Sequence, residues 1–387
     1  MSAPQRHPIR DQLAQIIADN ADQTCQQLTP AQWHHLVRAA KGHGLLPLLY
    51  HRLQRAGNLS LLPSHLQLIL RTGYYHTASR NTLLYRDLHD LLSAWSYTSI
   101  PPPVLIKGVV LAQTGYPQIA LRPMNDIDLL VPSEHVLAAL RVMQSINYRL
   151  FLVSHHLVLG STHPPRTHVD LHWSLFYRDT QGDPPPLAWF WQQVQPFTLS
   201  AASSHASTCH AQQLSTTAHV LYLIAHLGIQ HEGRHARLLW FYDLHLLLSQ
   251  QQHPIDWDAL LDRAATWGWS AMLADILTLT HQTFATTLPL WVLPALHRAA
   301  YTEDGVRRHT AIRVGGVIDV LRALSWSQRL VLLPTLLLPS PVYIRSRYPT
   351  RWPWLWPLAY PYCWADLAYD MVRAGSAKRR RVEASAR

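Results

Sequence analysis

Two aspartates separated by one residue stand at the start of an apolar run in this 387-residue chain. Asp126 and Asp128 flank Ile127, and Leu129 to Val131 follow. In a strand, the two carboxylates point to the same face, with Cα atoms about 6.5 Å apart. Two like charges so close are costly unless a cation neutralises them, and Mg²⁺ prefers carboxylate and phosphate oxygens. The spacing therefore predicts a Mg²⁺ site for phosphate chemistry, although an exposed strand with two solvated acids has the same spacing.

A third carboxylate lies in a later alternation of polar and apolar residues. Asp170 stands at the centre of the segment His168-Val169-Asp170-Leu171-His172, which is typical of a strand. An aspartate flanked by apolar residues needs a partner, because burying an unpaired carboxylate is expensive. A two-metal site requires a further acid beside the aspartate pair, so Asp170 is the candidate third ligand and a candidate general base.

Positive charge for a phosphate is available ahead of the aspartate pair. Lys107 and Gly108 follow the apolar run Val104 to Ile106. Glycine lets the backbone approach a phosphate closely, and lysine supplies a point charge. Arg122 is a second cation, which either reaches a phosphate or pairs with a structural acid, and the sequence leaves both roles open.

The run LIKGVVLAQTGYPQIALRPMNDIDLLV and the later HVDLHWSL resemble the polymerase-beta-like nucleotidyltransferase superfamily, specifically its branch of uncharacterised bacterial nucleotidyltransferases. The resemblance covers mainly residues 100–180. It implies that Asp126, Asp128 and Asp170 hold two Mg²⁺ ions and that the turn at Gly108 contacts the phosphates of a nucleoside triphosphate (NTP). The chain departs from the superfamily's pattern at this turn, because Lys107 stands where glycine is usual, and Asp126 follows Gly108 by a long interval of 18 positions.

The reaction that this resemblance implies is transfer of a nucleoside monophosphate (NMP) from an NTP to a hydroxyl-bearing acceptor. A sugar, an antibiotic, a peptide natural product and a protein side chain are all acceptors of this class. Attack on the γ-phosphate, as in a kinase, uses similar residues, and the sequence does not separate the two reactions. A non-catalytic interaction protein is a further alternative, which a missing metal requirement would favour.

A competing metal motif lies nearer the C-terminus. His231, Glu232 and His235 have the H-E-x-x-H spacing of zinc-dependent hydrolases. That chemistry requires a buried, apolar helix, whereas Gly233 and Arg234 occupy the intervening positions in a polar break. We therefore interpret this cluster as a cationic rim and keep the zinc hydrolase as the alternative.

The hydrophobic periodicity predicts strands that alternate with helices, and the resemblance implies an α+β fold with a mixed sheet and covering helices. Apolar residues recur at helical spacing up to about residue 95, three prolines interrupt the pattern at 101–103, and short apolar runs then alternate with helical segments. We expect an N-terminal helical region (1–100), a nucleotidyltransferase core (101–200), a C-terminal helical domain (201–329), and a Pro/Trp-rich segment with a basic tail (330–387).

The composition limits the classes of protein that fit the chain. A hydrophobic content of 48% with only 14% charged residues excludes disorder over most of the chain. Three distant cysteines cannot build a disulfide framework or a cysteine zinc finger. The N-terminus lacks the apolar stretch of a signal peptide, and no segment is apolar enough to span a bilayer. We therefore expect a cytoplasmic protein.

The positive net charge of the chain bears on whether it binds nucleic acid or an anionic membrane surface. The chain carries 33 Lys and Arg against 23 Asp and Glu, a net charge of +10, yet the arginines are spread widely and a nucleic-acid partner is not expected. The C-terminal segment is rich in Trp, Tyr and Pro and ends in Lys378 to Arg381. It predicts either peripheral contact with the inner membrane face or a Trp-rich segment packed on the helical domain, followed by a disordered tail.

Overall fold

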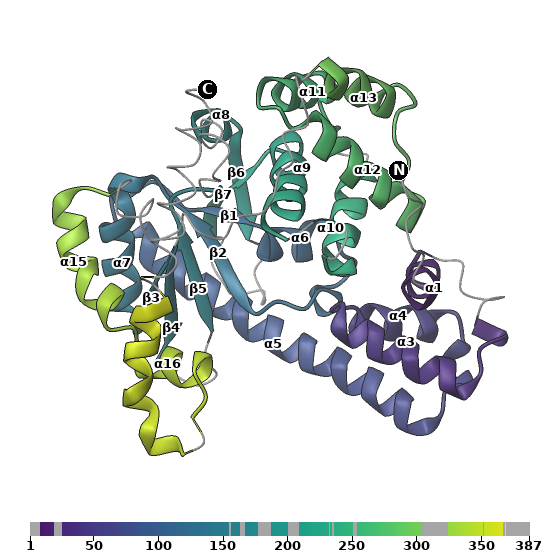
Figure 1. Ribbon diagram of the computed structural model, residues 1–387, viewed down its shortest axis with the longest axis horizontal. Helices are drawn as coiled ribbons and strands as arrows, with labels where there is room; N and C mark the ends of the chain where they lie inside the picture. The colour runs from purple at the N-terminus through teal and green to yellow at the C-terminus, as the bar shows by residue number, and fades with distance from the viewer. Residues whose placement is uncertain are drawn as a thin grey trace. The chain divides into compact units, whose positions relative to one another are not determined.

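A computed structural model of the chain describes residues 8–18, 25–154, 156–162, 167–176, 187–199, 209–231, 233, 236–250, 254–302, 324–350, 352–366 and 368 (Figure 1). Contacts divide the chain into two compact units. Unit 1 comprises Met1–Tyr85, Lys107–Met124 and Leu214–His309, and unit 2 comprises Arg86–Ile106, Asn125–Gln213 and Thr310–Arg387. Each unit thus gathers distant parts of the chain, while the four-part division expected from the sequence follows chain order and stays a prediction.

Unit 2 contains a seven-stranded sheet of order β3-β4-β5-β2-β1-β7-β6. Only Leu214, the last residue of β7, is assigned to unit 1. The pairs β1/β2, β3/β4 and β4/β5 are antiparallel, whereas β2/β5 and β1/β7 are parallel. The predicted α+β class with a mixed sheet is confirmed. The strand bounds are β1 (Val104–Ile106), β2 (Asp126–Leu130), β3 (Tyr148–Val153), β4 (Leu157–Ser161), β5 (His168–His172), β6 (Val194–Leu199) and β7 (Cys209–Leu214).

The central strands are stabilised by burial of their apolar side chains. All three residues of β1 are fully buried, as are Val169 and Leu171 of β5. These two residues alternate with the polar residues of β5, which therefore point to the opposite face. The sequence pattern predicted β1, β2 and β5, but it did not predict β6 and β7, where polar residues interrupt the apolar pattern.

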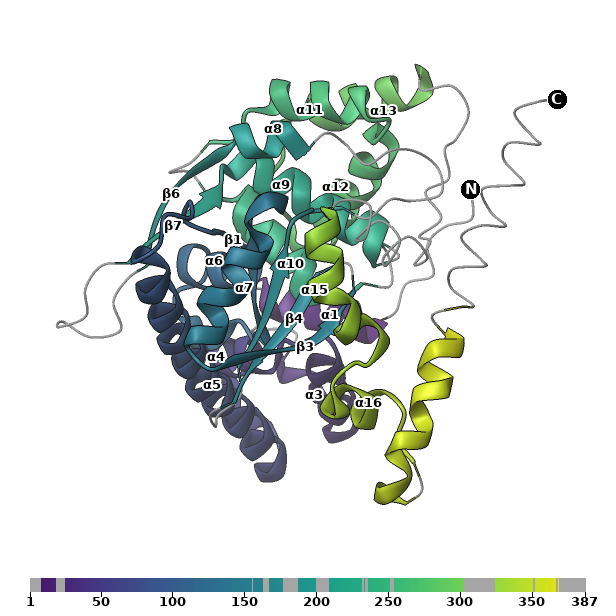
Figure 2. The same ribbon diagram turned by 90° about the vertical axis from the view of Figure 1, so that its left-hand side faces the viewer.

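Helices of unit 2 pack against strand β3 (Figure 2). Helices α7, α15 and α16 contact this strand, and the Gln328 side chain of α15 donates a hydrogen bond to the Ser133 carbonyl oxygen (2.8 Å). Helix α15 begins at a capping box, in which Ser325 and Gln328 satisfy each other's backbone amides. The elements are η3 (Ser133–His135), α7 (Val136–Ser145), α8 (Leu187–Gln192), α15 (Trp326–Leu337), α16 (Pro341–Arg347) and η6 (Pro353–Ala359).

Unit 1 is helical, and α12 contacts α1, α9, α10, α11 and α13 within it. Its helix α3 begins at a capping box of Thr29 and Gln32 with proline at the first position. The long helix α5 (Ser64–Ser96) contributes residues to both units. The other elements are α1 (Pro8–Ile17), α3 (Pro30–Gly42), α4 (Leu46–Arg55), η1 (Asn58–Leu61), α6 (Gly108–Thr114), η2 (Ile119–Leu121), α9 (Thr216–Ala225), the π-helix η4 (His226–Gln230), α10 (Leu238–Leu248), α11 (Trp257–Thr266), α12 (Ser270–Phe284) and α13 (Val292–Thr302).

Among the described helices, none combines the length and the apolar character that crossing a bilayer requires.

Candidate active site

Two neighbouring parallel strands place carboxylates side by side in unit 2. Strands β2 and β5 pair in a register that sets Asp128 directly opposite Asp170. Residues opposite each other in adjacent strands share a face of the sheet, and residues two apart in one strand share it too. Asp126, Asp128 and Asp170 therefore lie on one face, which is the arrangement that the sequence pattern predicted.

The three carboxylates differ in exposure. Asp128 is buried, whereas Asp126 and Asp170 are half-buried. The strand residues that alternate with these aspartates, Ile127, Leu129 and Val169, are fully buried on the opposite face of the sheet. A buried carboxylate among apolar strands must be compensated by hydrogen bonds, a cation or both.

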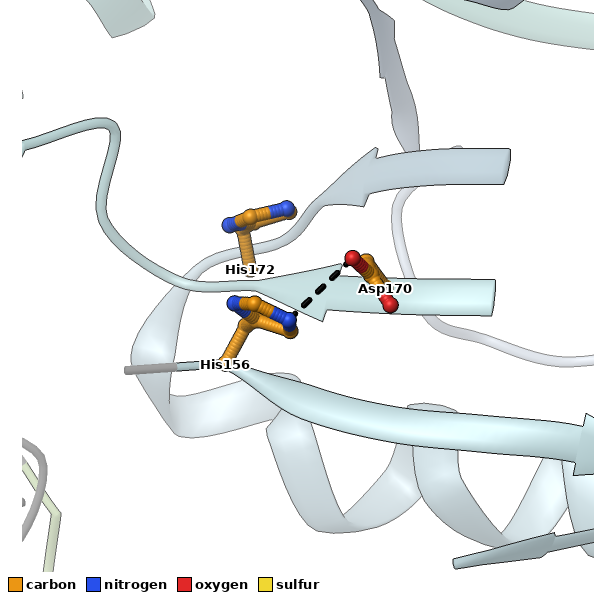
Figure 3. A group of neighbouring side chains, drawn as sticks. All are labelled: His156, Asp170 and His172. Atoms are coloured by element: carbon orange, nitrogen blue, oxygen red, sulfur yellow. Dashed lines mark ion pairs between the residues drawn. The ribbon is translucent and has the colours of Figure 1, made fainter. Parts of the chain in front are cut away.

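Two histidines lie beside two of these carboxylates, and Figure 3 shows both imidazoles together with Asp170. Nε2 of His172 lies 2.9 Å from Oδ1 of Asp128, and Nε2 of His156 lies 3.1 Å from Oδ2 of Asp170. The two imidazole rings are tilted against each other with centroids 4.7 Å apart. Asp128 and Asp170 thus each have an imidazole partner, and these four side chains form one connected polar cluster.

The sequence analysis did not identify these two histidines as site residues. His172 lies two residues after Asp170 on β5, so the same alternation that predicted Asp170 also places His172 on its face. His156 has no comparable signal, because it precedes β4 and reaches the cluster only through the pairing of β4 with β5.

Comparison with known proteins decides the family. A family model described as an uncharacterised nucleotidyltransferase matches residues 29–285, about two thirds of the chain. The chain belongs to this family. No curated protein and no solved structure matches the chain. The matched range includes Asp126, Asp128 and Asp170 and also the turn at Lys107 and Gly108.

That turn joins β1 to α6 and contains an unusual backbone conformation. Lys107 has φ 56° and ψ −122°, a left-handed conformation that favours glycine. Such a conformation in a non-glycine residue costs about 1–3 kcal/mol and persists only where the surroundings impose it. The chain thus combines a glycine-like backbone conformation with a lysine side chain at this position.

Gly108 and Arg122 pack against each other in unit 1. A Cβ atom added to Gly108 would lie 2.6 Å from Nη1 of Arg122, so any larger residue at position 108 displaces the guanidinium. Nε and Nη2 of Arg122 donate to the two carboxylate oxygens of Asp243 at 2.9 and 2.8 Å. Arg122 therefore has a structural acid as its partner, while Nη1 is the nitrogen beside the turn.

A tyrosine completes the Arg122 network. The hydroxyl of Tyr116 donates to Oδ1 of Asp243 at 2.7 Å. Burial, followed by the negative charge of Asp243, raises the pKa of Tyr116 well above its ordinary value, so this hydroxyl keeps its proton. The network fixes the segment after η2 against helix α10.

The alternative zinc motif falls partly outside the described residues, which include His231 but neither Glu232 nor His235. His231 follows the π-helix η4, with its Nε2 3.2 Å from Nε2 of His226 and its ring 4.2 Å from that of Trp240.

Proposed function

We propose that this protein transfers a nucleotidyl group from an NTP to a hydroxyl-bearing acceptor, with Mg²⁺ held by Asp126, Asp128 and Asp170. The observation that carries the proposal is the in-register pairing of β2 with β5, which sets Asp128 opposite Asp170 on the face that Asp126 shares. Membership of a nucleotidyltransferase family supports the same reaction class.

The donor set fits a divalent cation. Carboxylate oxygens are the ligands that Mg²⁺ prefers, and the buried Asp128 gains most from a positive partner. Bound Mg²⁺ ions would neutralise phosphate charge and lower the pKa of an acceptor hydroxyl. The aspartates in turn fix where the phosphates and the acceptor bind.

The turn between β1 and α6 is the proposed phosphate-binding element. Ile106, the last residue of β1, pairs with Asp128, so the chain enters this turn directly from the strand position opposite an aspartate. Gly108 leaves the backbone accessible, and Lys107 provides a positive charge for phosphate oxygens. Nη1 of Arg122, which lies beside Gly108, is the second proposed phosphate contact.

In the proposed reaction, the acceptor oxygen attacks the α-phosphorus of the NTP. The bond from this phosphorus to the bridging oxygen of the β-phosphate breaks, and pyrophosphate leaves with that electron pair. The acceptor proton passes to the carboxylate of Asp170, which the hydrogen bond from His156 holds in place. The products are the NMP ester of the acceptor and pyrophosphate.

The products formed from NTPs test this reaction. The protein is incubated with Mg²⁺, glycerol as a simple hydroxyl acceptor, and each of ATP, GTP, CTP and UTP, and the products are followed by ³¹P NMR. We expect one NTP to yield pyrophosphate with NMP or its glycerol ester, and Asp128→Asn to abolish the yield. Formation of a nucleoside diphosphate instead would show γ-phosphoryl transfer, and turnover that Asp128→Asn leaves unchanged would contradict the site.

A further inference from the structure

The imidazoles beside the aspartates offer a second kind of metal ligand. His156, Asp170 and His172 each direct one ligand atom to a common point, and these atoms lie within 4.8 Å of one another (Figure 3). His172 is buried, and His156 and Asp170 are half-buried, so a bound ion would be largely shielded from bulk water. The three residues come from β5 and from the segment just before β4, and these two strands pair directly.

The chemistry of this group differs from that of a site for Mg²⁺ alone. Imidazole nitrogen suits Zn²⁺ and neighbouring first-row ions, whereas Mg²⁺ selects oxygen ligands. Metal–ligand bonds of about 2.0–2.1 Å in a tetrahedral Zn²⁺ site place neighbouring ligand atoms roughly 3.3 Å apart. The 3.1 Å separation of Nε2 of His156 and Oδ2 of Asp170 is close to that value. Two of the three ligand atoms therefore already have the spacing that such an ion needs.

We infer that His156, Asp170 and His172 bind one first-row transition-metal ion of the Zn²⁺, Co²⁺ or Mn²⁺ class. Asp128, hydrogen-bonded to His172, orients this imidazole as an outer-shell carboxylate. The inference rests on the proposed function in that Asp170 serves both ligand sets, and it specifies which metal one position of the site selects. Binding of the ion is measurable without any nucleotide, which separates the two proposals.

Co²⁺ is the probe, because its visible absorption reports ligand number and geometry. Metal-free full-length protein is titrated with Co²⁺ in the presence of excess Mg²⁺ and without NTP. We expect one equivalent to bind in a site that Mg²⁺ does not fill, and His156→Gln and Asp170→Asn to weaken binding at least tenfold. His210→Gln, a change at an exposed histidine of β7, serves as the control and keeps wild-type affinity.

X-ray absorption of the wild-type protein loaded with less than one equivalent of Zn²⁺ avoids any variant that folds poorly. The inference predicts two imidazole ligands, falling to one in His156→Gln. Wild-type affinity in both His156→Gln and Asp170→Asn, or a Zn²⁺ ion with no imidazole ligand, would overturn it. NTP turnover with Mg²⁺ in a protein that does not bind Co²⁺ would leave the proposed function intact and reject only this inference.

An independent observation concerns the surface of helix α15. Trp326, Leu330, Leu333 and Leu337 recur at helical spacing and are all exposed, Trp326 to 77%. The stripe of Gln328, Leu332 and Leu336 on another side of α15 is buried, and the helix contacts β3. Helix α15 therefore carries an apolar stripe beyond the one that its own unit uses.

The surroundings of this stripe are aromatic and basic. Trp352, Trp354, Tyr362 and Trp364 are exposed in the segment that follows, and the guanidinium of Arg329 stacks 4.7 Å from the ring centroid of Trp326. Residues 324–387 contain ten Lys and Arg against three Asp and Glu, which is +7 of the net +10 of the chain. Exposed tryptophans with excess positive charge match the headgroup region of an anionic bilayer.

We propose that α15 and the following segment dock on an anionic lipid surface, with the exposed stripe of Trp326, Leu330, Leu333 and Leu337 inserted among the lipids. Full-length protein is sedimented with phosphatidylcholine vesicles, with and without phosphatidylglycerol. Binding should require the anionic lipid, weaken with salt, and fall at least tenfold in Leu330→Glu. Leu290→Glu, at a leucine of unit 1 that is even more exposed than Leu330, is the control.

Two results would overturn this docking proposal. One is the absence of binding to anionic vesicles. The other is a dimer in light scattering that Leu330→Glu dissociates, because the stripe then pairs with a second copy of the chain.

Discussion

At the scale of single residues, Lys107 is a strained position that we interpret as functional. We predict that Lys107→Gly raises the free energy of unfolding by about 1 kcal/mol, because glycine adopts the left-handed backbone at φ 56° without a steric cost. The same change should weaken NTP binding, since it removes the charge proposed to contact phosphate. Urea unfolding and calorimetric titration with Mg²⁺-NTP measure the two effects.

The opposite signs of these effects make the Lys107 prediction specific. The control is Lys41→Ala, which removes an exposed lysine of helix α3 and should change neither stability nor NTP affinity. Alanine replaces glycine in this control because glycine is unfavourable within a helix. Loss of stability in Lys107→Gly, or unchanged NTP affinity, would show that the turn is held for another reason.

Residue patterns predicted part of the candidate site and missed the rest for a physical reason. Asp126, Asp128 and Asp170 are recognisable because strand alternation acts within a short segment. The partners His156 of Asp170 and Asp243 of Arg122 depend on which elements pack together, and Asp243 lies 121 residues from Arg122. Short-range periodicity contains no information on such pairings.

At the scale of elements, the buried ion pair of Arg122 and Asp243 joins the segment after η2 to helix α10. We predict that Asp243→Asn lowers the free energy of unfolding by about 3 kcal/mol or more, because it leaves the Arg122 guanidinium buried without its counter-charge. Urea unfolding checks this value. Asp275→Asn, on the exposed side of α12, should change stability little.

A double substitution tests the cause of that loss. Arg122→Met combined with Asp243→Leu removes both charges, so it should be more stable than Asp243→Asn alone. Equal destabilisation by the single and double changes would indicate that packing, rather than the unpaired charge, is responsible.

The elements themselves were predictable where they are apolar. Strands β1, β2 and β5 and most helices follow from hydrophobic periodicity, because burial on one face fixes the period. Strand β7 did not, because CHAQQL is largely polar and is held in place by parallel pairing with β1. Backbone hydrogen bonding between strands tolerates almost any side chain, so the sequence of β7 does not predict a strand.

At the scale of the whole molecule, the buried His219 makes stability depend on pH. Burial, and next the charge of Arg122, lowers the pKa of His219 to about 4 from its ordinary 6.5. His219 is therefore protonated below pH 6.5 in the unfolded chain, but only below about pH 4 in the folded protein. This contribution to stability is complete above pH 6.5, and about 3 kcal/mol of it is lost as the pH falls to 4.

We predict that His219→Gln, which cannot take up a proton, reduces this acid sensitivity. Urea unfolding of both proteins from pH 8 to pH 4 should give stability curves that diverge below pH 6.5. Parallel curves would mean that His219 is protonated to the same extent in the folded and unfolded states.

The central claim is that Asp126, Asp128 and Asp170 form a Mg²⁺-dependent NTP site, and calorimetric titration of the full-length protein with each NTP tests it most directly. We predict that one NTP binds with Mg²⁺, that EDTA abolishes binding, and that Asp126→Asn and Asp128→Asn each weaken it at least tenfold, while Asp275→Asn does not. Ligand at 100 times its Kd adds about 2.7 kcal/mol to the free energy of unfolding. Mg²⁺-NTP should therefore raise the thermal unfolding temperature of the wild type and of Asp275→Asn more than that of Asp126→Asn or Asp128→Asn. Mg²⁺-NTP binding of wild-type strength in Asp126→Asn and Asp128→Asn would contradict the account.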